Sequence, residues 1–282
     1  MEADGKEEIP DLKSLRLFDS CITIGRIVHS GDDCMVPTQG VHSGYPQYLT
    51  KDNIIGVLKR YCIVEALVHE HHARVVTPRK TGNYSLLDTI KDMPQLHPVW
   101  VLEPPQKPGK AAAEALVAEM LNAGVRVARL CMKVAPPLPW LWNDLCAVLQ
   151  DHRVPCMLDF GDVATIGSIT DSDMAGIYDL ATMHPKLPMV FSHAVGGHGV
   201  HYGLVPSIYR TKNLYLDITG VLNYWCDVAL EVGPERVLFA TGAPFTDPGI
   251  YVSNVQYAAG LSAESKRMIC GDNLRRLIGD VK

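Results

Sequence analysis

The sequence predicts an α/β protein with a single domain, a (β/α)8 TIM barrel. Eight short runs rich in Val, Ile and Leu recur along the 282 residues, and most of the gaps between them are long enough for a helix. Segments with the apolar spacing of helices fill those gaps. A doubly wound open sheet is the alternative, but such a sheet usually has fewer strands and a glycine-rich first turn, which this sequence lacks.

The elements follow in chain order. The predicted strands cover residues 15–24, 62–68, 99–103, 125–131, 155–160, 188–194, 214–220 and 237–242. The predicted helices cover residues 51–61, 85–93, 111–124, 139–152, 170–185, 201–211, 221–233 and 262–279. Thr170 and Ser262 stand where their hydroxyls would cap a helix start, and Gly124, Gly233 and Gly279 stand where helices are expected to end.

The N-terminal segment is predicted to be a polar leader over residues 1–14, before a barrel that covers residues 15–282. It is acidic and has no basic stretch followed by an apolar one, so no secretory signal is expected. The apolar runs are too short to span a bilayer, which predicts no membrane contact. A net charge of -5 without a long basic cluster predicts no nucleic-acid partner.

The eight cysteines are scattered singly, and no pair has CxxC spacing. In a chain of this size without a secretory signal, this pattern favours free thiols in a reducing compartment, so the predicted location is cytoplasmic.

Two connections are longer than packing requires, and both follow predicted strands. They cover residues 25–50 and 70–84. The carboxyl ends of the strands form the face on which barrels of this kind carry their chemistry, so we expect these loops to cover a pocket.

The last third of the chain carries a resemblance to a known family. The segments are PMVFSHAVGGHG at 188–199, NLYLDITG at 213–220, GPERVLFATGAPF at 233–245 and GLSAESKRMICGDNLRRLIG at 260–279. They resemble strands six, seven and eight and the last helix of the amidohydrolase superfamily, in its amidohydrolase-related (amidohydrolase 2) branch. That branch also includes decarboxylases and lactonases, and the resemblance extends over nearly the whole chain.

The resemblance also implies where a metal would bind, and most of those positions differ here. Cys21 and Thr23 stand where the family has a His-x-His pair, and Asp159 stands at the strand-five histidine. His193 matches the strand-six histidine, whereas Gly242 replaces the strand-eight aspartate. The chain is thus expected to be a divergent member that lacks most metal ligands. No cofactor is expected; the alternative is a single divalent metal such as zinc on Asp159, His193 and Cys21.

Asp159 and His193 are the predicted catalytic pair. Asp159 lies in a buried strand, where a carboxylate must be paired, protonated or turned toward a pocket, and in the pocket it could act as a general acid or base. His193 ends an apolar strand at the carboxyl face and precedes a glycine-rich turn that lets the backbone approach a ligand. Structural roles are the alternative for both.

Four further residues are predicted to bind the substrate. Arg129 could point to solvent or into the barrel mouth, and the inward direction would let its guanidinium bind a carboxylate. His69 begins the sequence HEHH and lies at a strand end, although the histidines after it continue into a loop and are often only solvated there. Cys21 could be a ligand, a nucleophile or a small buried apolar residue. His198 follows strand six near the same mouth.

Two more carboxylates lie near the predicted mouth. Asp217, within a strand, could simply hold a neighbouring backbone group. Asp247 could replace the missing strand-eight carboxylate only if its loop folds back, and Asp-Pro-Gly is more often a plain turn.

These residues predict an enzyme for a small polar or carboxylate-bearing molecule. It would be a lactone or amide hydrolase, or a lyase or decarboxylase, and would use acid/base chemistry with a degenerate or absent metal site. The alternative is a non-catalytic barrel that binds a small ligand or a protein partner. Trp140 and Trp142 could form an apolar patch for a homo-oligomer, although ordinary helix packing is the favoured interpretation.

Overall fold

The protein alternates strands and helices along the chain. The computed structural model describes residues 9–26, 48–75, 79–132, 134–160, 169–192, 195–196, 199–200, 202–221, 224–244 and 246–282. The eight strands of the central parallel sheet are β1 (Phe18–Arg26), β3 (Glu65–Glu70), β4 (Leu96–Leu102), β5 (Val127–Cys131), β6 (Cys156–Asp159), β7 (Met189–Ser192), β10 (Leu214–Asp217) and β11 (Val237–Leu238). Each of the eight predicted strands has its counterpart among them.

These eight strands are parallel and close into a barrel. Neighbours pair in the order β11-β10-β7-β6-β5-β4-β3-β1. β11 then meets β1: Ser20 N donates to Phe239 O at 3.0 Å, and Gly242 N donates to Cys21 O at 3.0 Å. The predicted single-domain (β/α)8 barrel is therefore confirmed. Three short strands lie outside it: β2 (Tyr48–Leu49) pairs antiparallel with β1, and β8 (Val195–Gly196) pairs with β9 (Gly199–Val200).

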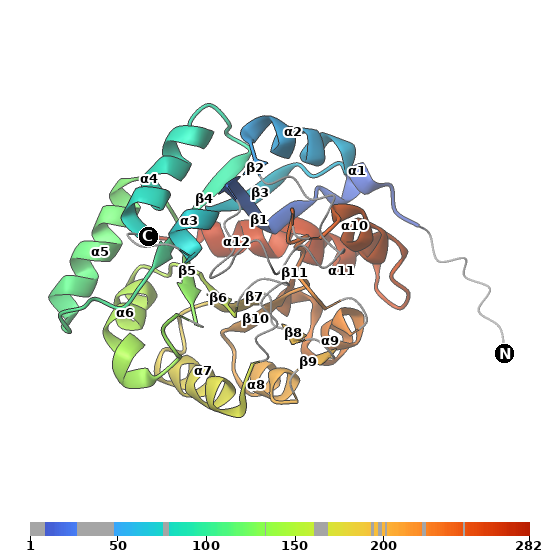
Figure 1. Ribbon diagram of the computed structural model, residues 1–282. Coiled ribbons are helices and arrows are strands. Elements are labelled where there is room, and N and C mark those ends of the chain that lie inside the picture. The colour runs from blue at the N-terminus through green and yellow to red at the C-terminus, as the bar shows by residue number, and fades with distance from the viewer. Residues whose placement is uncertain are drawn as a thin grey trace.

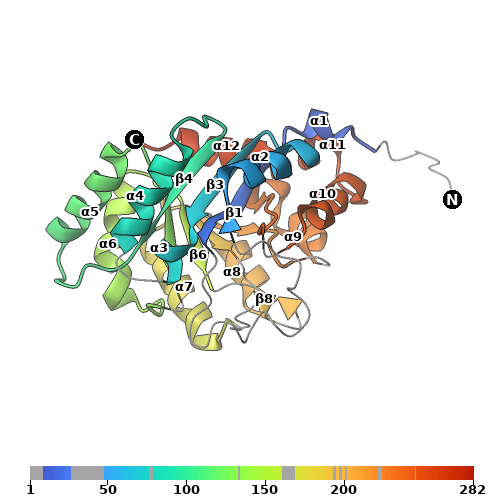
Figure 2. The ribbon, with the colours of Figure 1, turned by 45° about the horizontal axis from the view of Figure 1, so that its top comes forward.

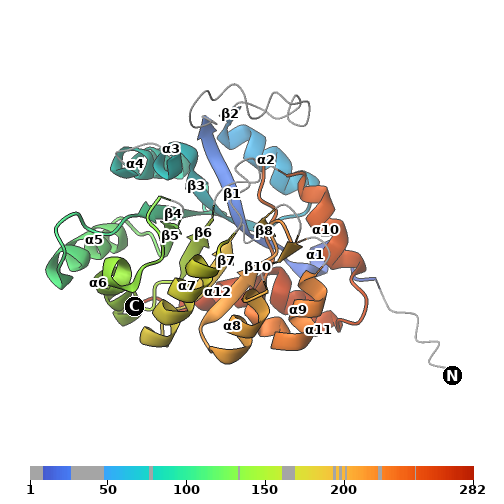
Figure 3. The same ribbon diagram turned by 60° about the horizontal axis from the view of Figure 1, so that its bottom comes forward.

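Most of the helices form a ring around the strands (Figure 1; Figure 3). They are α1 (Leu12–Leu15), α2 (Lys51–Arg60), α3 (His71–Val75), α4 (Arg79–Ile90), α5 (Lys110–Asn122), α6 (Pro139–Asp151), α7 (Asp171–Met183), α8 (Leu204–Arg210), α9 (Trp225–Val232), α10 (Pro248–Tyr257), α11 (Ala263–Arg267) and α12 (Asn273–Gly279). Figure 2 shows α12 at one end of the barrel, opposite the end where β8 lies.

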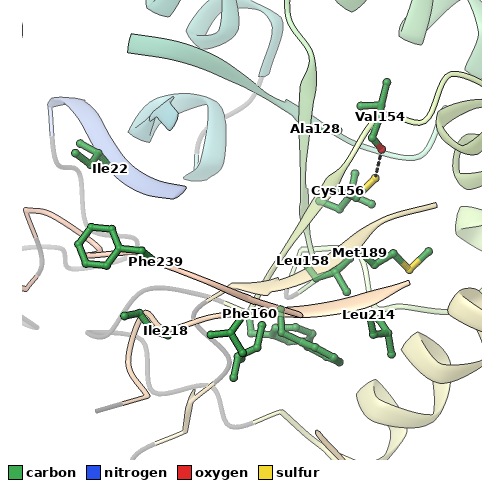
Figure 4. Packing of buried hydrophobic residues seen from close by; sticks show 14 of the residues in the cluster. Ile22, Ala128, Val154, Cys156, Leu158, Phe160, Met189, Leu214, Ile218 and Phe239 are labelled. Carbon is green, nitrogen blue, oxygen red and sulfur yellow. Dashed lines mark hydrogen bonds between the residues drawn. The ribbon is translucent and has the colours of Figure 1, made fainter. Parts of the chain in front are cut away.

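The core has two layers because successive strand side chains point to opposite faces. The outward side chains pack under the helices; Ala128, Leu158 and Met189 belong to this outer layer, which Figure 4 shows. The inward side chains form an apolar floor with one residue from each barrel strand, and Leu274 and Leu277 of α12 close it from below. The floor residues of the strands are Phe18, Leu67, Val99, Val127, Met157, Val190, Tyr215 and Leu238.

Most of the predicted helix ends are correct. Thr170 forms a complete capping box with Asp173, and the Ser262 hydroxyl accepts from Ser265 N. Gly124 and Gly233 have positive φ angles of 79° and 97° just after helices, where glycine avoids a steric penalty. The prediction for Gly279 was wrong by one residue, because Gly279 is the last residue of α12 and the C-cap is Asp280.

Three segments differ from the prediction. Residues 70–84 are not a long loop, because α3 begins at His71 and α4 at Arg79. The prediction left residues 243–261 without structure, yet they contain α10, for which Asp247 is the N-cap and accepts from Gly249 N. Asp247 also accepts from Tyr61 Oη at 2.7 Å, so it caps a helix rather than replacing the strand-eight carboxylate. Strand β1 begins three residues later than predicted, after α1.

The described residues also include most of the cysteines and both tryptophans of α6. The seven cysteines within the described ranges form no disulfide with one another. Every helix in those ranges is too short or too polar to cross a bilayer. Trp142 is fully buried and donates from Nε1 to Pro136 O at 3.0 Å, which is ordinary packing, whereas Trp140 is 78% exposed. Residues 1–8 and most of the connection at residues 25–50 lie outside the described residues.

Candidate functional site

A layer of polar side chains lies directly above the apolar floor. Side chains two residues apart along a strand point to the same face, so the residue two positions after a floor residue also points inward. Strand β1 departs from this rule, because its pairing with β3 shifts register between Asp19 and Ile22. On five of the other seven strands this position is polar, and all five side chains are buried: His69, Arg129, Asp159, Ser192 and Asp217. We call this group the polar layer. It lies toward the carboxyl ends of the strands, where barrels of this kind bind their ligands.

Two arginines bind Asp159 in this layer. Arg74, from α3, donates from Nε to Asp159 Oδ2 at 2.5 Å and from Nη2 to Oδ1 at 3.0 Å. Arg129, from β5, donates from Nε to Oδ2 at 2.7 Å. The three side chains are at most 4% exposed. Charge-assisted hydrogen bonds of this kind offset the cost of burying the ions and fix the direction of both guanidinium groups.

Arg129 points inward and crosses from β5 toward β1. Its Nη1 and Nη2 lie 3.8 Å and 3.9 Å from Cys21 Sγ. Burial opposes the charge of the guanidinium, but Asp159 outweighs it and raises the pKa of Arg129, so it stays positive. Burial raises the pKa of Cys21 to about 12, so this residue is a thiol at neutral pH rather than a thiolate.

His69 lies at the carboxyl end of β3 and contacts β1. Its Nε2 is 3.0 Å from Thr23 Oγ1, and the ring is 1% exposed. His71 is buried at the first position of α3, and the side chain of His72 lies outside the described residues. The histidine sequence therefore starts a helix instead of continuing into a loop, and this helix also carries Arg74.

Asp217 is the second carboxyl group of the polar layer. Its Oδ1 accepts from Thr219 N at 3.0 Å, so it holds a neighbouring backbone group, as one sequence-based interpretation expected. Among the described residues, Oδ2 and the hydroxyls of Ser192 and Thr219 have no partner with hydrogen-bond geometry. Burial raises the pKa of Asp217 to about 6, although Ser192 beside it and the charge of Arg129 act in the opposite direction. Asp217 can therefore exchange a proton near neutral pH.

Asp19 lies at the seam where the barrel closes. Its Oδ1 accepts from Cys21 N at 2.9 Å and from Thr241 N at 3.0 Å, and its Oδ2 accepts from Thr241 Oγ1 at 2.5 Å. Burial raises the pKa of this carboxyl to about 7. The group joins β1 to the segment after β11 and so fixes Cys21 at its place in the barrel.

The structure therefore brings Asp159, Arg129 and Cys21 into contact and places His69 in the same polar layer. His193 and His198 lie outside the described residues. Sequence reasoning missed Arg74, because residues 70–84 show no clear helical spacing. It passed over Asp19, although an acid between apolar residues in a predicted strand is a signal that could have identified it.

A comparison with known protein families gives a match over most of the chain. A family model described as amidohydrolase matches residues 65–279. The chain belongs to the amidohydrolase family. A comparison with curated proteins finds no match.

Solved structures similar to this amidohydrolase share its fold. An uncharacterised TIM-barrel protein from Bordetella bronchiseptica has a TM-score of 0.70 at 17% identity, and the match covers 94% of this chain and 98% of that one. The 5-carboxyvanillate decarboxylase of Sphingomonas paucimobilis has a TM-score of 0.70 at 13% identity, with 95% and 100% covered. A dihydroxybenzoic acid decarboxylase of Polaromonas, solved with manganese and an inhibitor, has a TM-score of 0.67 at 14% identity, with 93% and 96% covered.

The manganese in the Polaromonas structure raises the question of whether the residues here fit a metal. Asp159 already accepts three hydrogen bonds from two guanidinium groups, and Cys21 is a thiol that faces one of them. Within the described ranges no three His, Cys, Asp or Glu side chains are grouped to hold an ion. A divalent cation between Asp159 and Cys21 would lie against the Arg129 guanidinium. These contacts do not fit a metal at that place.

Proposed function

We propose that this amidohydrolase is a carbon–carbon lyase that decarboxylates a small polar carboxylic acid. The observation that carries the proposal is one fixed cation and one protonatable acid in the same buried layer: Arg129 and Asp217. Decarboxylation needs a group that holds the substrate carboxylate and an acid that gives a proton to the carbon left behind. Two of the similar structures are decarboxylases of aromatic acids, which supports the same reaction class.

In the proposed reaction, the guanidinium of Arg129 binds the substrate carboxylate. Its two Nη groups face Cys21 Sγ at distances of a weak contact, which a carboxylate would replace as the stronger acceptor. The bond between the substrate carbon and its carboxylate breaks, and the electron pair stays on that carbon. The carbon takes the proton of Asp217, carbon dioxide leaves, and water returns a proton to Asp217.

The other predicted site residues have supporting places in this proposal. Asp159 holds both arginines in position, and its hydrogen bonds to them suit orientation better than proton transfer. His193 follows Ser192 in the sequence and is the proposed second group for proton exchange. His69, Cys21 and His198 are proposed to contact the substrate. Hydrolysis of a lactone or amide is less favoured, because Gly242 replaces the carboxylate that would accept a proton from the attacking water.

The test is carbon dioxide release from a panel of small aromatic and aliphatic carboxylic acids that includes dihydroxybenzoates. For an acid that is turned over, Asp217→Asn should lower kcat about 100-fold or more. Because Asp217 must carry a proton, kcat of the wild type should fall as the pH rises above about 6. Asp88→Asn, which changes an exposed carboxylate on α4, is the matched control and should leave kcat unchanged. Turnover that survives Asp217→Asn would contradict the assignment of the acid.

A non-catalytic ligand-binding barrel is the second candidate function. The observation that favours it is the replacement of the family's first-strand and last-strand metal ligands by Cys21, Thr23 and Gly242. It is supported if no acid releases carbon dioxide while one of them raises the Tm of the wild type but not that of Arg129→Met.

A further inference from the structure

We infer that the guanidinium of Arg129 replaces the divalent metal ion in this barrel, as a covalently attached cation that binds a planar carboxylate. The part of the inference that concerns metal binding is independent of catalysis, and the part that concerns the carboxylate rests on the proposed function.

The guanidinium of Arg129 lies between Asp159 and Cys21. By resemblance to the family, Cys21 occupies a metal-ligand position on the first barrel strand and Asp159 occupies one on the fifth. Arg129 contacts both: its Nε lies 2.7 Å from Asp159 Oδ2, and its Nη atoms lie 3.8 Å and 3.9 Å from Cys21 Sγ. One positively charged side chain thus spans two positions that would otherwise converge on an ion.

Asp159 and His69 are both committed to protein contacts. Arg74 takes both oxygens of Asp159, so a cation at this carboxylate would meet two guanidinium groups. Thr23 stands at the second position of the family's His-x-His pair, and its Oγ1 lies 3.0 Å from His69 Nε2. This contact occupies the ring nitrogen of His69 that could otherwise bind a metal. The sequence changes at positions 21 and 23 and the inward Arg129 are therefore parts of one rearrangement.

The exchange of a metal for a guanidinium has chemical consequences. A metal can bind and acidify water, and a guanidinium cannot. A guanidinium instead donates parallel hydrogen bonds that match the two oxygens of a carboxylate. The expected ligand is therefore a carboxylate on a small, flat molecule, and the chemistry at this place is charge stabilisation without metal-activated water.

The first measurement is the metal content of the full chain. Purified without an affinity tag for metals, and after incubation with zinc or manganese and desalting, the protein should contain well under one tenth of an ion per chain by mass spectrometry of the elements. Its Tm should be the same with and without EDTA. About one ion per chain, removed by EDTA together with a fall in Tm, would overturn the inference.

The second measurement uses benzoate as the carboxylate probe and benzamide, its uncharged analogue, as the control. Benzoate should raise the Tm of the wild type, and benzamide should not. Arg129→Lys keeps the positive charge but loses the paired donors, and should weaken benzoate binding about tenfold or more in calorimetry. Equal binding of benzoate to both proteins, or of benzamide and benzoate to the wild type, would contradict the carboxylate assignment.

The two experiments separate this inference from the proposed function. If Arg129→Lys does not fold, the metal content and the benzoate comparison on the wild type still decide. A metal-free protein that binds benzoate but turns over no acid would refute the lyase and leave the inference standing. A protein that decarboxylates an acid only with bound metal would refute the inference and keep the lyase.

Discussion

Asp159 is the residue on which the buried arginines depend. Replacing it with asparagine keeps the shape but leaves Arg74 and Arg129 without the carboxylate that holds them. Removing one partner of a buried ion pair typically costs about 3–5 kcal/mol, so Asp159→Asn should lower the free energy of unfolding by about that amount in urea titrations. The exposed Asp88→Asn control should change it by less than about 0.5 kcal/mol. A small effect at both positions would mean that the arginines find other partners.

Asp217 should make stability depend on pH. Its pKa in the folded protein is about 6, above the ordinary value of 3.8, so its contribution to stability is present below about pH 4 and is lost as the pH rises through 6. Asparagine does not titrate, and Asp217→Asn should therefore gain stability relative to the wild type by about 2–3 kcal/mol between pH 4 and pH 7. Urea titrations of both proteins at four pH values check this. A constant difference would show that the group titrates at its ordinary pKa.

Helix α3 places Arg74, and its position depends on the close approach of α4. A Cβ atom at Gly82 of α4 would lie 2.6 Å from Ala73 N and 2.7 Å from Glu70 Oε2, which is closer than side chains normally approach. Gly82→Ala should push α3 away from the barrel, destabilise the protein by about 1–3 kcal/mol and weaken benzoate binding. Gly56→Ala in α2 is the control, because nothing lies within 4 Å of its Cβ. There the helix propensity of alanine should raise stability by about 0.5–1 kcal/mol. Equal effects at both glycines would contradict the packing argument.

The elements were predictable where a local pattern encodes them. Apolar runs separated by amphipathic segments identified all eight barrel strands, and hydroxyl caps such as Thr170 located helix starts. Helix α3 was not predictable, because five residues with two adjacent histidines carry no periodic signal and the helix depends on packing against α4. Without α3, Arg74 could not be inferred as a partner of Asp159.

At the scale of the whole molecule, the sequence predicted that the carboxyl ends of the strands converge. It did not predict which hydrogen bonds the side chains at these ends form with one another. An inward Arg129 and a pocket-facing Asp159 were both expected separately. Their hydrogen bond requires the pairing of β5 with β6, which places Cys131 beside Asp159 and Arg129 beside Met157. Because neighbouring side chains decide whether a buried carboxylate is an acid, an ion pair or a metal ligand, the roles within the site depend on this register.

Barrel closure depends on the seam between β1 and the segment after β11. The Thr241 hydroxyl donates to Asp19 Oδ2 at 2.5 Å within a fully buried network that also receives two backbone N–H groups. Thr241→Val keeps the shape but removes this donor, and a buried acceptor that loses its partner costs about 1–3 kcal/mol. Thr241→Val should therefore lower the free energy of unfolding by that amount, whereas Thr89→Val on the exposed side of α4 should change it little. Because the seam closes the ring, the amide hydrogens of Thr23 and Gly242, which bond across it, should exchange faster in Thr241→Val than in the control. If the free energy of unfolding falls but hydrogen exchange at these two amides is unchanged, the hydroxyl stabilises the protein in another way than by closing the barrel.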